Sequence, residues 1–376
     1  MRLAALTLAA LLSAATAPAI NVVLDYTYDS GSFFSTGTAN GQKARATVKA
    51  AADYFSSILD DSFARVQKPN DYVSTAPNSP NAISTWNWSI EFENPSTGGT
   101  VLIDNPVIPA DEYRIYVGAR NLPTSTLGFG GPGGGSRRSS ISYYFPSQLA
   151  EIEAITEDFF AAVDRRGEPV GEFGRWGGSL TFDTVGTTWN YDHTVAPTSG
   201  QNDLLSVALH EIGHTLGFGA SAEFQGLGVG NFFTGLEATA ANGGSNPGIT
   251  VDKGHWTNGT ISTVFGGSAS QEAAMDPSIT TGTRKLWTAL DAAALADIGW
   301  DVVTPGLLGD YNSDNLVNAA DYTIWRDSLG TGNVIGTYAE WRDNYGASAP
   351  ASSLAVPEPG SLVLLLLAGS GWRRRC

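Results

Sequence analysis

Cysteine is nearly absent from this chain of 376 residues, which contains a single one, Cys376. One thiol cannot form an intramolecular disulfide or supply a multi-cysteine metal cluster. Histidine and methionine are also scarce, with four and two copies. Any metal site built on imidazole must therefore use a small set of residues that the sequence identifies.

Basic residues are few as well, because 21 lysines and arginines stand against 37 aspartates and glutamates, for a formal net charge of -16. This excess of negative charge repels phosphate backbones and anionic lipid headgroups, and it argues against nucleic acid as a partner. Hydrophobic residues make up 42% of the chain and include 10 tryptophans, which is enough apolar surface to offset chain entropy. We therefore expect a folded protein of two or three domains.

Neither end of the chain has an apolar run of the roughly 20 residues that a membrane span requires. Residues 1–19 contain one basic residue, Arg2, and then a shorter apolar stretch. Ala17, Pro18 and Ala19 follow and fit the small-residue cleavage site of an exported protein. This order predicts a secretory signal peptide over residues 1–19.

The C-terminal end combines an apolar segment with a basic cluster. The motif Pro-Glu-Pro at 357–359 precedes the segment, which begins at Leu362, and residues 373–375 are arginines. An apolar segment closed by arginines has the character of a stop-transfer signal. It resembles the PEP-CTERM sorting tail of bacteria, and the resemblance implies removal by an exosortase-type sorting enzyme. We expect residues 348–376 to be a linker and sorting tail, the protein to be secreted or at the cell surface of a bacterium, and membrane contact to be transient and confined to the termini.

Between the two ends, apolar spacing predicts both helices and strands. Alternation of apolar and polar residues marks a half-buried strand, and a spacing of three or four marks a helix with one buried face. The predicted strands are 20–28, 86–92, 112–120 and 178–182. The predicted helices are 43–60, 147–164 with Ser147 as its cap, 203–216 with Asp203 as its cap, and 284–298. These types alternate without a regular βαβ rhythm, so we predict an α+β fold.

A glycine-rich run, GFGGPGGGS, begins at Gly128. It lacks the G-x-x-x-x-G-K-[ST] pattern of a phosphate-binding loop, so it does not point to a nucleotide. Glycine is typical of turns and mobile connections. We therefore expect a flexible surface loop.

The strongest chemical signal is H-E-x-x-H at His210, Glu211 and His214, within the predicted helix 203–216. Because four residues make about one helical turn, both imidazoles lie on one face and can reach a single Zn²⁺ ion. Glu211 lies beside them, where its carboxylate can take a proton from water. The pattern predicts a catalytic zinc site in which Glu211 is the catalytic residue.

Catalytic zinc sites usually have three protein ligands, so a third residue is needed. In the extended pattern H-E-x-x-H-x-x-G-x-x-H, the glycine is present as Gly217, but the last histidine position holds Ala220. The remaining histidines are His193, in NYDHTV, and His255, in DKGHWT. A downstream glutamate such as Glu237 is a further alternative, because two histidines and one glutamate also bind zinc.

Residues 20–303 resemble the metzincin metallopeptidases, and among them the leishmanolysin-like members. Three features carry the resemblance: the helix sequence HEIGHTLGF, the later pair His255 and Trp256, and Met275 in AAMDP. The resemblance implies a twisted mixed sheet, a long active-site helix and a C-terminal helix after a methionine turn. It also implies a set of roles, in which His210, His214 and His255 bind zinc, Glu211 is the general base, Met275 is the apolar floor below the metal, and Gly217 permits the turn after the helix.

Past Pro305 the composition shifts to Asp, Asn and Gly, which predicts a domain boundary. Residues 310–321, DYNSDNLVNAAD, place oxygen ligands at the offsets of a calcium loop. The six ligands are Asp310, Asn312, Asp314, the carbonyl of Leu316, Asn318 and Asp321. The loop resembles a type I dockerin repeat, with a partial echo in which TYAEWRDNYG matches DYTIWRDSLG. The resemblance implies a small helical module over 305–347 with one Ca²⁺ ion and a cohesin-like partner, and a polar linker is the alternative.

These patterns together predict a secreted zinc-dependent endopeptidase that hydrolyses peptide bonds in a protein or peptide substrate. Two alternatives stay open on the sequence. One is a catalytically inactive surface-binding protein that keeps the metzincin fold, and the other is a scaffold component of the dockerin type. The expected order of parts is the signal peptide 1–19, the catalytic domain 20–303, the calcium module 305–347, and the tail 348–376.

Overall fold

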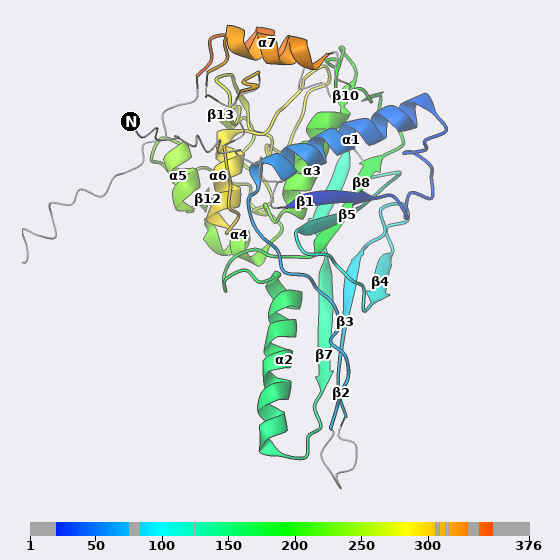
Figure 1. Cartoon of the computed structure of the whole chain (residues 1–376). Helices are drawn as coiled ribbons and strands as arrows, with labels where there is room; N and C mark the ends of the chain where they lie inside the picture. The colour runs from blue at the N-terminus through cyan, green and yellow to red at the C-terminus, as the bar shows by residue number, and fades with distance from the viewer. Residues whose placement is uncertain are drawn as a thin grey trace, which may run out of the picture. The chain divides into compact units, whose positions relative to one another are not determined.

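The computed structural model (Figure 1) describes residues 20–74, 83–123, 125–304, 309–312, 314, 316–329 and 338–348. The predicted signal peptide, and the predicted tail beyond residue 348, lie outside these residues. The chain divides into two compact units, residues 1–305 and 306–376, and each is described by itself. Within the described residues, none of the helices combines the length and the apolar character needed to cross a bilayer.

The first unit is an α+β structure built on a mixed sheet of four strands. In their order of pairing, the strands are β1 (Asn21–Asp25), β5 (Glu112–Arg120), β8 (Gly177–Asp183) and β6 (Gly128–Pro132). β1, β5 and β8 run parallel, and β6 runs antiparallel to β8. Every residue of β8 is buried, as is typical of a parallel strand that is covered on both faces. The predicted α+β class is confirmed.

Two helices cover one face of this sheet. α1 (Ala39–Ile58) packs against β1 and against α3 (Leu204–Thr215), and α3 packs in turn against β6 and β8. The buried side of α1 includes Val48, Ala52 and Phe55, at the helical spacing that the sequence predicts. The helix that carries the H-E-x-x-H motif therefore lies between a second helix and the edge of the sheet.

A second sheet covers the opposite face. Its strands are β2 (Tyr72–Val73), β3 (Ile83–Glu93), β4 (Thr100–Asp104) and β7 (Gly134–Ser140), and each of the other three pairs with β3 in antiparallel fashion. Along β5, Ile115 and Val117 face the core shared with the helices, whereas Tyr116 faces the second sheet. The ring of Tyr116 stacks on that of Phe92 in β3, with centroids 4.2 Å apart. α2 (Pro146–Arg165) packs against β3 and β7.

The glycine-rich run from Gly128 is not a surface loop but forms β6 and β7, so that prediction was wrong. Glycine is required there because neighbouring groups approach the backbone closely. A Cβ atom on Gly130 would lie 2.2 Å from the carbonyl oxygen of Glu211 in α3, and one on Gly133 would lie 1.9 Å from the ring of Trp176. A side chain does not fit in such a space. The sequence shows the glycines, but only the packed structure shows what excludes a side chain.

The start of α2 also differs from the prediction. The helix begins at Pro146 and not after a Ser147 cap. The side chain of Gln148 reaches back and accepts the amide N–H groups of Tyr144 and Phe145, at 2.9 and 3.2 Å. Proline suits the first helical position because an amide N–H there has no partner within the helix.

α6 (Ala289–Asp297) is shorter than the predicted helix 284–298, and Thr288 caps it. The residues before the cap are held by other partners, since the amide of Lys285 donates to the hydroxyl of Ser206 at 2.8 Å. Leu286, which belongs to the predicted range but precedes α6, is 36% exposed.

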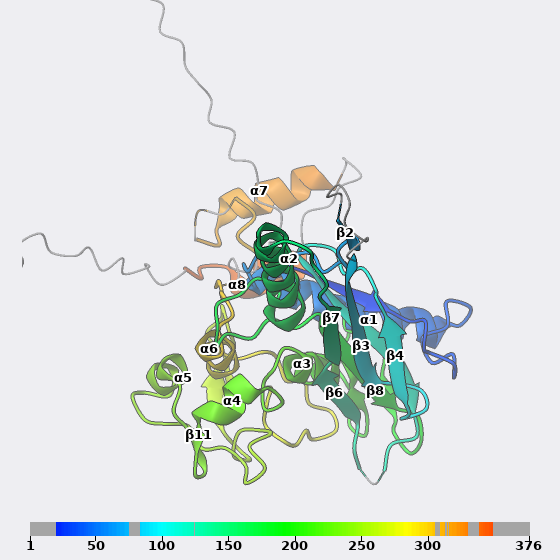
Figure 2. The ribbon, with the colours of Figure 1, turned by 90° about the horizontal axis from the view of Figure 1, so that it is seen from below.

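Shorter elements complete the first unit. They are β9 (Trp189–Asn190), β10 (Asn202–Asp203), α4 (Ala222–Leu227), β11 (Gly228–Val229), β12 (Phe232–Phe233), α5 (Leu236–Ala241), β13 (Ile261–Thr263) and β14 (Ser270–Glu272). α5 packs against α6. Figure 2 shows α4, α5 and α6 on the side of α3 that faces away from the sheets. The long loops on this side, which lie within residues 242–288, can therefore place side chains next to α3.

The second unit contains the predicted calcium loop and two helices, α7 (Ala319–Ser328) and α8 (Tyr338–Asn344). Asn318 caps α7 with its side chain. The helices meet through aromatic rings, and the centroids of Tyr322 and Trp341 are 4.9 Å apart.

We expect Gly133→Ala to lower the free energy of unfolding by about 1–3 kcal/mol, because the added methyl group overlaps the ring of Trp176. The matched control is Gly131→Ala in β6, where no atom lies within 4 Å of the added Cβ. Urea unfolding followed by tryptophan fluorescence measures both variants. Equal midpoints for the two would contradict the packing account of these glycines.

Candidate metal centre

Helix α3 carries the H-E-x-x-H residues, and a buried carboxylate fixes its start. Asp203 accepts the amide N–H and the hydroxyl of Ser206, at 3.2 and 2.7 Å, which satisfies a donor that helix geometry leaves free. The guanidinium of Arg284 pairs with the same carboxylate at 2.8 Å. A fully buried carboxylate needs such a partner. The predicted cap at Asp203 is confirmed, and it attaches α3 to the segment before α6.

The other end of α3 is held by a glycine turn and by two side-chain donors. Gly217 has a φ of 102°, in the left-handed region that favours glycine. The hydroxyl of Tyr113 donates to the carbonyl of Thr215, and the indole of Trp300 donates to that of Leu216 at 2.8 Å. Both ends of the helix are therefore held in place, and the positions of its histidines are fixed with them.

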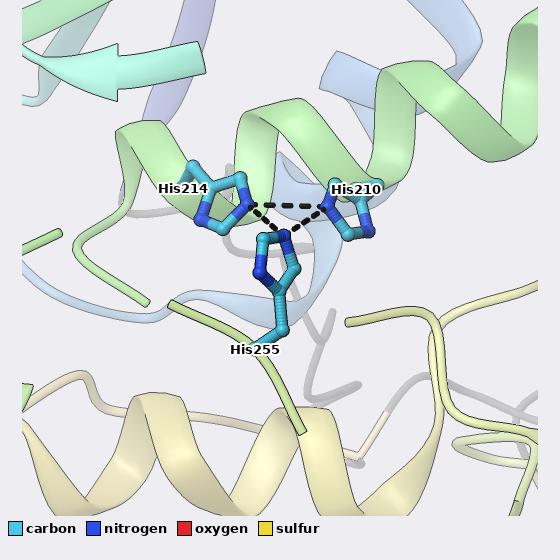
Figure 3. Close-up of side chains that lie close together, drawn as sticks. All are labelled: His210, His214 and His255. Atoms are coloured by element: carbon cyan, nitrogen blue, oxygen red, sulfur yellow. Dashed lines mark hydrogen bonds between the residues drawn. The ribbon is translucent and has the colours of Figure 1, made fainter. Parts of the chain in front are cut away.

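His210, His214 and His255 point at one another, as Figure 3 shows. The Nε2 atoms of His210 and His214 are 3.1 Å apart, and each lies 3.2 Å from the Nε2 atom of His255. Three nitrogens bound to one tetrahedral zinc ion at 2.0–2.1 Å would lie about 3.3 Å apart. The observed spacing is close to that of a ligand set, so the three residues could hold a metal ion.

Backbone carbonyls determine which nitrogen of two of these rings carries the proton. The Nδ1 atom of His210 lies 2.7 Å from the carbonyl oxygen of Ala274, and that of His214 lies 2.9 Å from the carbonyl oxygen of Phe218. Because a carbonyl can only accept, each Nδ1 must donate, which leaves a lone pair on each Nε2. Lone pairs that converge repel one another unless a cation lies between them, so the donor set fits a metal.

Burial keeps these imidazoles neutral at physiological pH. Desolvation, with the neighbouring His255 adding to it, lowers the pKa of His214 to about 4. Burial and the neighbouring histidines hold the pKa of His210 well below its ordinary value, and burial also lowers the pKa of His255. Neutral imidazole is the form that binds metals, so the site need not lose protons first.

Glu211 lies beside the three histidines in an open cavity of about 610 Å³. Residues 128–130 of the edge strand β6 line the cavity with it. Only 7% of Glu211 is exposed. Burial raises the pKa of its carboxyl to about 8, and a hydrogen bond from the backbone of Gly130 acts against this rise. A carboxyl with a pKa near neutrality is suited both to take and to release a proton.

A buried aspartate in α6 positions the third histidine. Trp256, next to His255, donates its indole N–H to Asp291 at 2.8 Å and its backbone N–H to the carbonyl of Met275 at 3.0 Å. The same carboxylate accepts the amide N–H groups of Ala274 and Met275, at 2.8 and 3.2 Å. One side chain therefore attaches both His255 and the turn at residues 274–275 to α6.

Met275 packs against the helix backbone between the two histidines of α3. Its side chain is fully buried, and a Cβ atom added to Gly213 would lie 2.7 Å from its sulfur. Gly213 directly precedes His214. The methionine is therefore buried against the same helix that carries the two histidines.

The other candidate zinc ligands lie elsewhere. The Nδ1 atom of His193 is 3.3 Å from the hydroxyl of Thr47 in α1, and Glu237 is exposed in the first turn of α5. Neither residue lines the cavity. The structure brings His255 close to His210 and His214, whereas His193 and Glu237 lie outside the cavity.

The predicted calcium ligands all belong to the described part of the second unit. The carboxylate of Asp321 is buried. It accepts three backbone amides, those of Tyr311, Asn312 and Asn318, at 2.8, 3.1 and 2.8 Å. Across the residues that the structure describes, the three histidines are the only such group of histidine, cysteine or acidic side chains close enough to share an ion. The acids of this loop do not converge in the same way.

Two contributors to the site were missed from the sequence, namely the strand β6 and the carboxylate of Asp291. Asp291 follows Thr288 by three residues and forms a capping box with it, so this spacing could have identified it as a structural residue. The glycines of β6 predicted a turn, since glycine is typical of turns. Their actual role, close packing against α3, depends on a helix that is distant in the sequence.

We expect His255→Ala to weaken binding of one Zn²⁺ ion by about 100-fold or more, because two imidazoles leave the site without its third ligand. The matched control is His193→Ala, which removes the fourth histidine and keeps the three that converge. Isothermal titration of the metal-free chain with Zn²⁺ measures both. Equal losses in the two variants, or tight binding in both, would contradict the ligand set.

Comparison of the chain with family models, with curated proteins and with solved structures found no match. A proposal for the function therefore depends on the geometry and the chemistry of the site.

Proposed function

We propose that the first unit is a zinc-dependent endopeptidase of the metzincin type, in which His210, His214 and His255 bind the zinc ion. The observation that carries the proposal is the convergence of three neutral imidazoles beside a buried glutamate in one open cavity. Three protein ligands with one position left for water or substrate are typical of catalytic zinc. The order of active-site helix, His-Trp pair and methionine turn, with α6 after it, supports the same family.

The chain's own residues account for the remaining chemistry of peptide hydrolysis. When bound, zinc supplies a Lewis acid that polarises a carbonyl and acidifies water. The three histidines hold the ion, and the carbonyls of Ala274 and Phe218 orient two of the rings. Glu211 takes a proton from the attacking water and passes it to the leaving amine as the C–N bond breaks. A cation nearby favours the ionised form of this carboxyl, which burial otherwise disfavours.

Strand β6 supports a peptide as the substrate. It is the edge strand of the four-stranded sheet, and its residues 128–130 line the cavity beside Glu211. An extended peptide can add to a sheet edge through main-chain hydrogen bonds. A peptide bond laid along this edge would lie close to both the glutamate and the histidines.

The alternative of an inactive surface-binding protein depends on a missing third ligand. The Nε2 atom of His255 is 3.2 Å from the Nε2 atom of each of the other two histidines, which supports a third ligand. This favours the enzyme over the inactive protein.

We expect Glu211→Gln to reduce casein hydrolysis by about 10²–10⁴-fold while zinc stays bound, because the amide cannot accept the proton of water. The matched control is Glu237→Gln, since this glutamate is exposed and lies outside the cavity. Proteolysis assays with and without a chelator, together with the zinc content of each variant, measure the effect. Activity close to wild type in Glu211→Gln would refute its role as the base.

For the second unit we propose a single calcium site in the dockerin-like loop 310–321. Side-chain oxygens of the loop turn toward its own backbone, since Asp310 accepts the amide N–H of Asp314 at 3.1 Å. Asn312 donates its side-chain N–H to the carboxylate of Asp314 at 2.9 Å, so the first three ligand positions are neighbours in space. Oxygen ligands at these offsets suit Ca²⁺.

We expect the double variant Asp310→Asn, Asp314→Asn to lose calcium binding, because it removes two of the charged ligands. The control is Asp327→Asn, an exposed acid on α7. Terbium luminescence sensitised by Tyr311, and its displacement by Ca²⁺, reports binding in the full chain. A wild-type chain without a signal, or a double variant with an unchanged one, would exclude the site.

A further inference from the structure

An apolar and largely aromatic surface lies at the end of the first unit where β2, β3, β7 and α2 come together. Figure 1 shows these elements running together away from α3 to a common end. Six large side chains on this surface, which we call the aromatic tip, are 43–49% exposed: Val73, Ile83, Ile141, Tyr143, Tyr144 and Phe145.

Hydrogen bonds join the segments of the aromatic tip into one surface. The hydroxyl of Ser84 donates to the carbonyl of Ser142 and accepts its amide N–H, both at 2.9 Å. The side chain of Gln148 in α2 donates to the hydroxyl of Ser74 at 2.7 Å. The strand ends and the start of α2 are thus held side by side, so the apolar groups form one patch.

The described segments that form the aromatic tip carry no charged side chain of their own, and the nearest charges are Glu151 in α2 and Arg138, which lies opposite Asn87 where β7 pairs with β3. Residues 72–74, 83–90 and 139–150 contain no aspartate, glutamate, lysine or arginine, in a chain whose net charge is -16. The acid that follows on α2, Glu151, accepts the hydroxyl of Tyr72 at 3.0 Å. A surface without charge does not attract a charged partner, and the acidic remainder of the chain repels an anionic one.

The size of the patch argues against a stable protein partner or a second copy of this chain. Six half-exposed side chains offer on the order of 500 Å², whereas a stable protein interface buries about 800 Å² on each side. Tyrosine has an apolar ring with a polar end, and such side chains concentrate at the boundary between water and the hydrocarbon of a membrane.

We propose that the aromatic tip inserts into the headgroup region of a bilayer whose surface carries no net charge, such as one of zwitterionic phospholipid. The contact holds the first unit at the membrane surface. It is independent of the peptidase activity, because no residue of the tip lines the cavity beside the histidines.

The test measures flotation of the full chain with phosphatidylcholine vesicles. We expect the triple variant Tyr143→Ser, Tyr144→Ser, Phe145→Ser to reduce the vesicle-bound fraction at least tenfold. The matched control is Val170→Ser, Val251→Ser, because both valines are 86% exposed and lie away from the tip. A wild-type chain that does not float, a triple variant that floats as well as wild type, or binding to anionic vesicles alone would each overturn the proposal.

A local probe separates the tip from the apolar segments that the sequence shows near both termini. In a Cys376→Ser background, an environment-sensitive fluorophore on Ser147→Cys, in the first turn of α2, reports entry into the bilayer. The same fluorophore on Val170→Cys is the control. We expect a blue shift on vesicle binding at residue 147 and none at residue 170. Equal shifts at the two positions, or none at residue 147, would show that the tip does not enter the membrane.

Discussion

The first unit depends on the buried carboxylate of Asp291. It accepts the indole N–H of Trp256, the amides of Ala274, Met275 and Thr288, and the hydroxyl of Thr288 at 2.6 Å. A carboxylate with no exposed surface is costly unless such donors satisfy it. Burial raises its pKa, and these hydrogen bonds act against the rise. His255 is 41 residues from His214 in the sequence, and the Asp291 side chain fixes the segment that carries His255 relative to α6.

A second constraint is the close approach of β6 to α3. The edge of the sheet comes so near the helix that a side chain on Gly130 would meet the carbonyl oxygen of Glu211. Strand β6 helps to bury the glutamate and lines the cavity beside it. Burial raises the pKa of the carboxyl, and the hydrogen bond from the backbone of Gly130 acts against this rise. The same packing therefore gives the carboxyl its chemistry and brings a sheet edge, on which an extended peptide could pair, next to it.

The cavity and the aromatic tip are two separate surfaces of one unit, and they differ in the physics of recognition. The cavity brings together three imidazoles whose pKa values burial lowers, and their convergence suits a metal cation. The six side chains of the tip include no acid and no base that is charged at neutral pH, and its contacts depend on apolar area and on the dual character of tyrosine. A peptidase held at a bilayer by the second surface would meet its substrates near that bilayer.

Local periodicity in the sequence was enough to predict several helices and strands of this protein. The strand 112–120, the capped helix from Asp203, and the two histidines one helical turn apart all follow from patterns within a few residues of one another. Scarcity of histidine left few candidates for a third ligand, and the metzincin resemblance implied His255. The tertiary structure brings its imidazole to those of His210 and His214, where the three could hold a metal ion. Only the tertiary structure turned the glycine-rich run into two strands. The reason is physical, since the atoms that exclude a Cβ and the acceptor that holds Trp256 come from segments far away in the sequence.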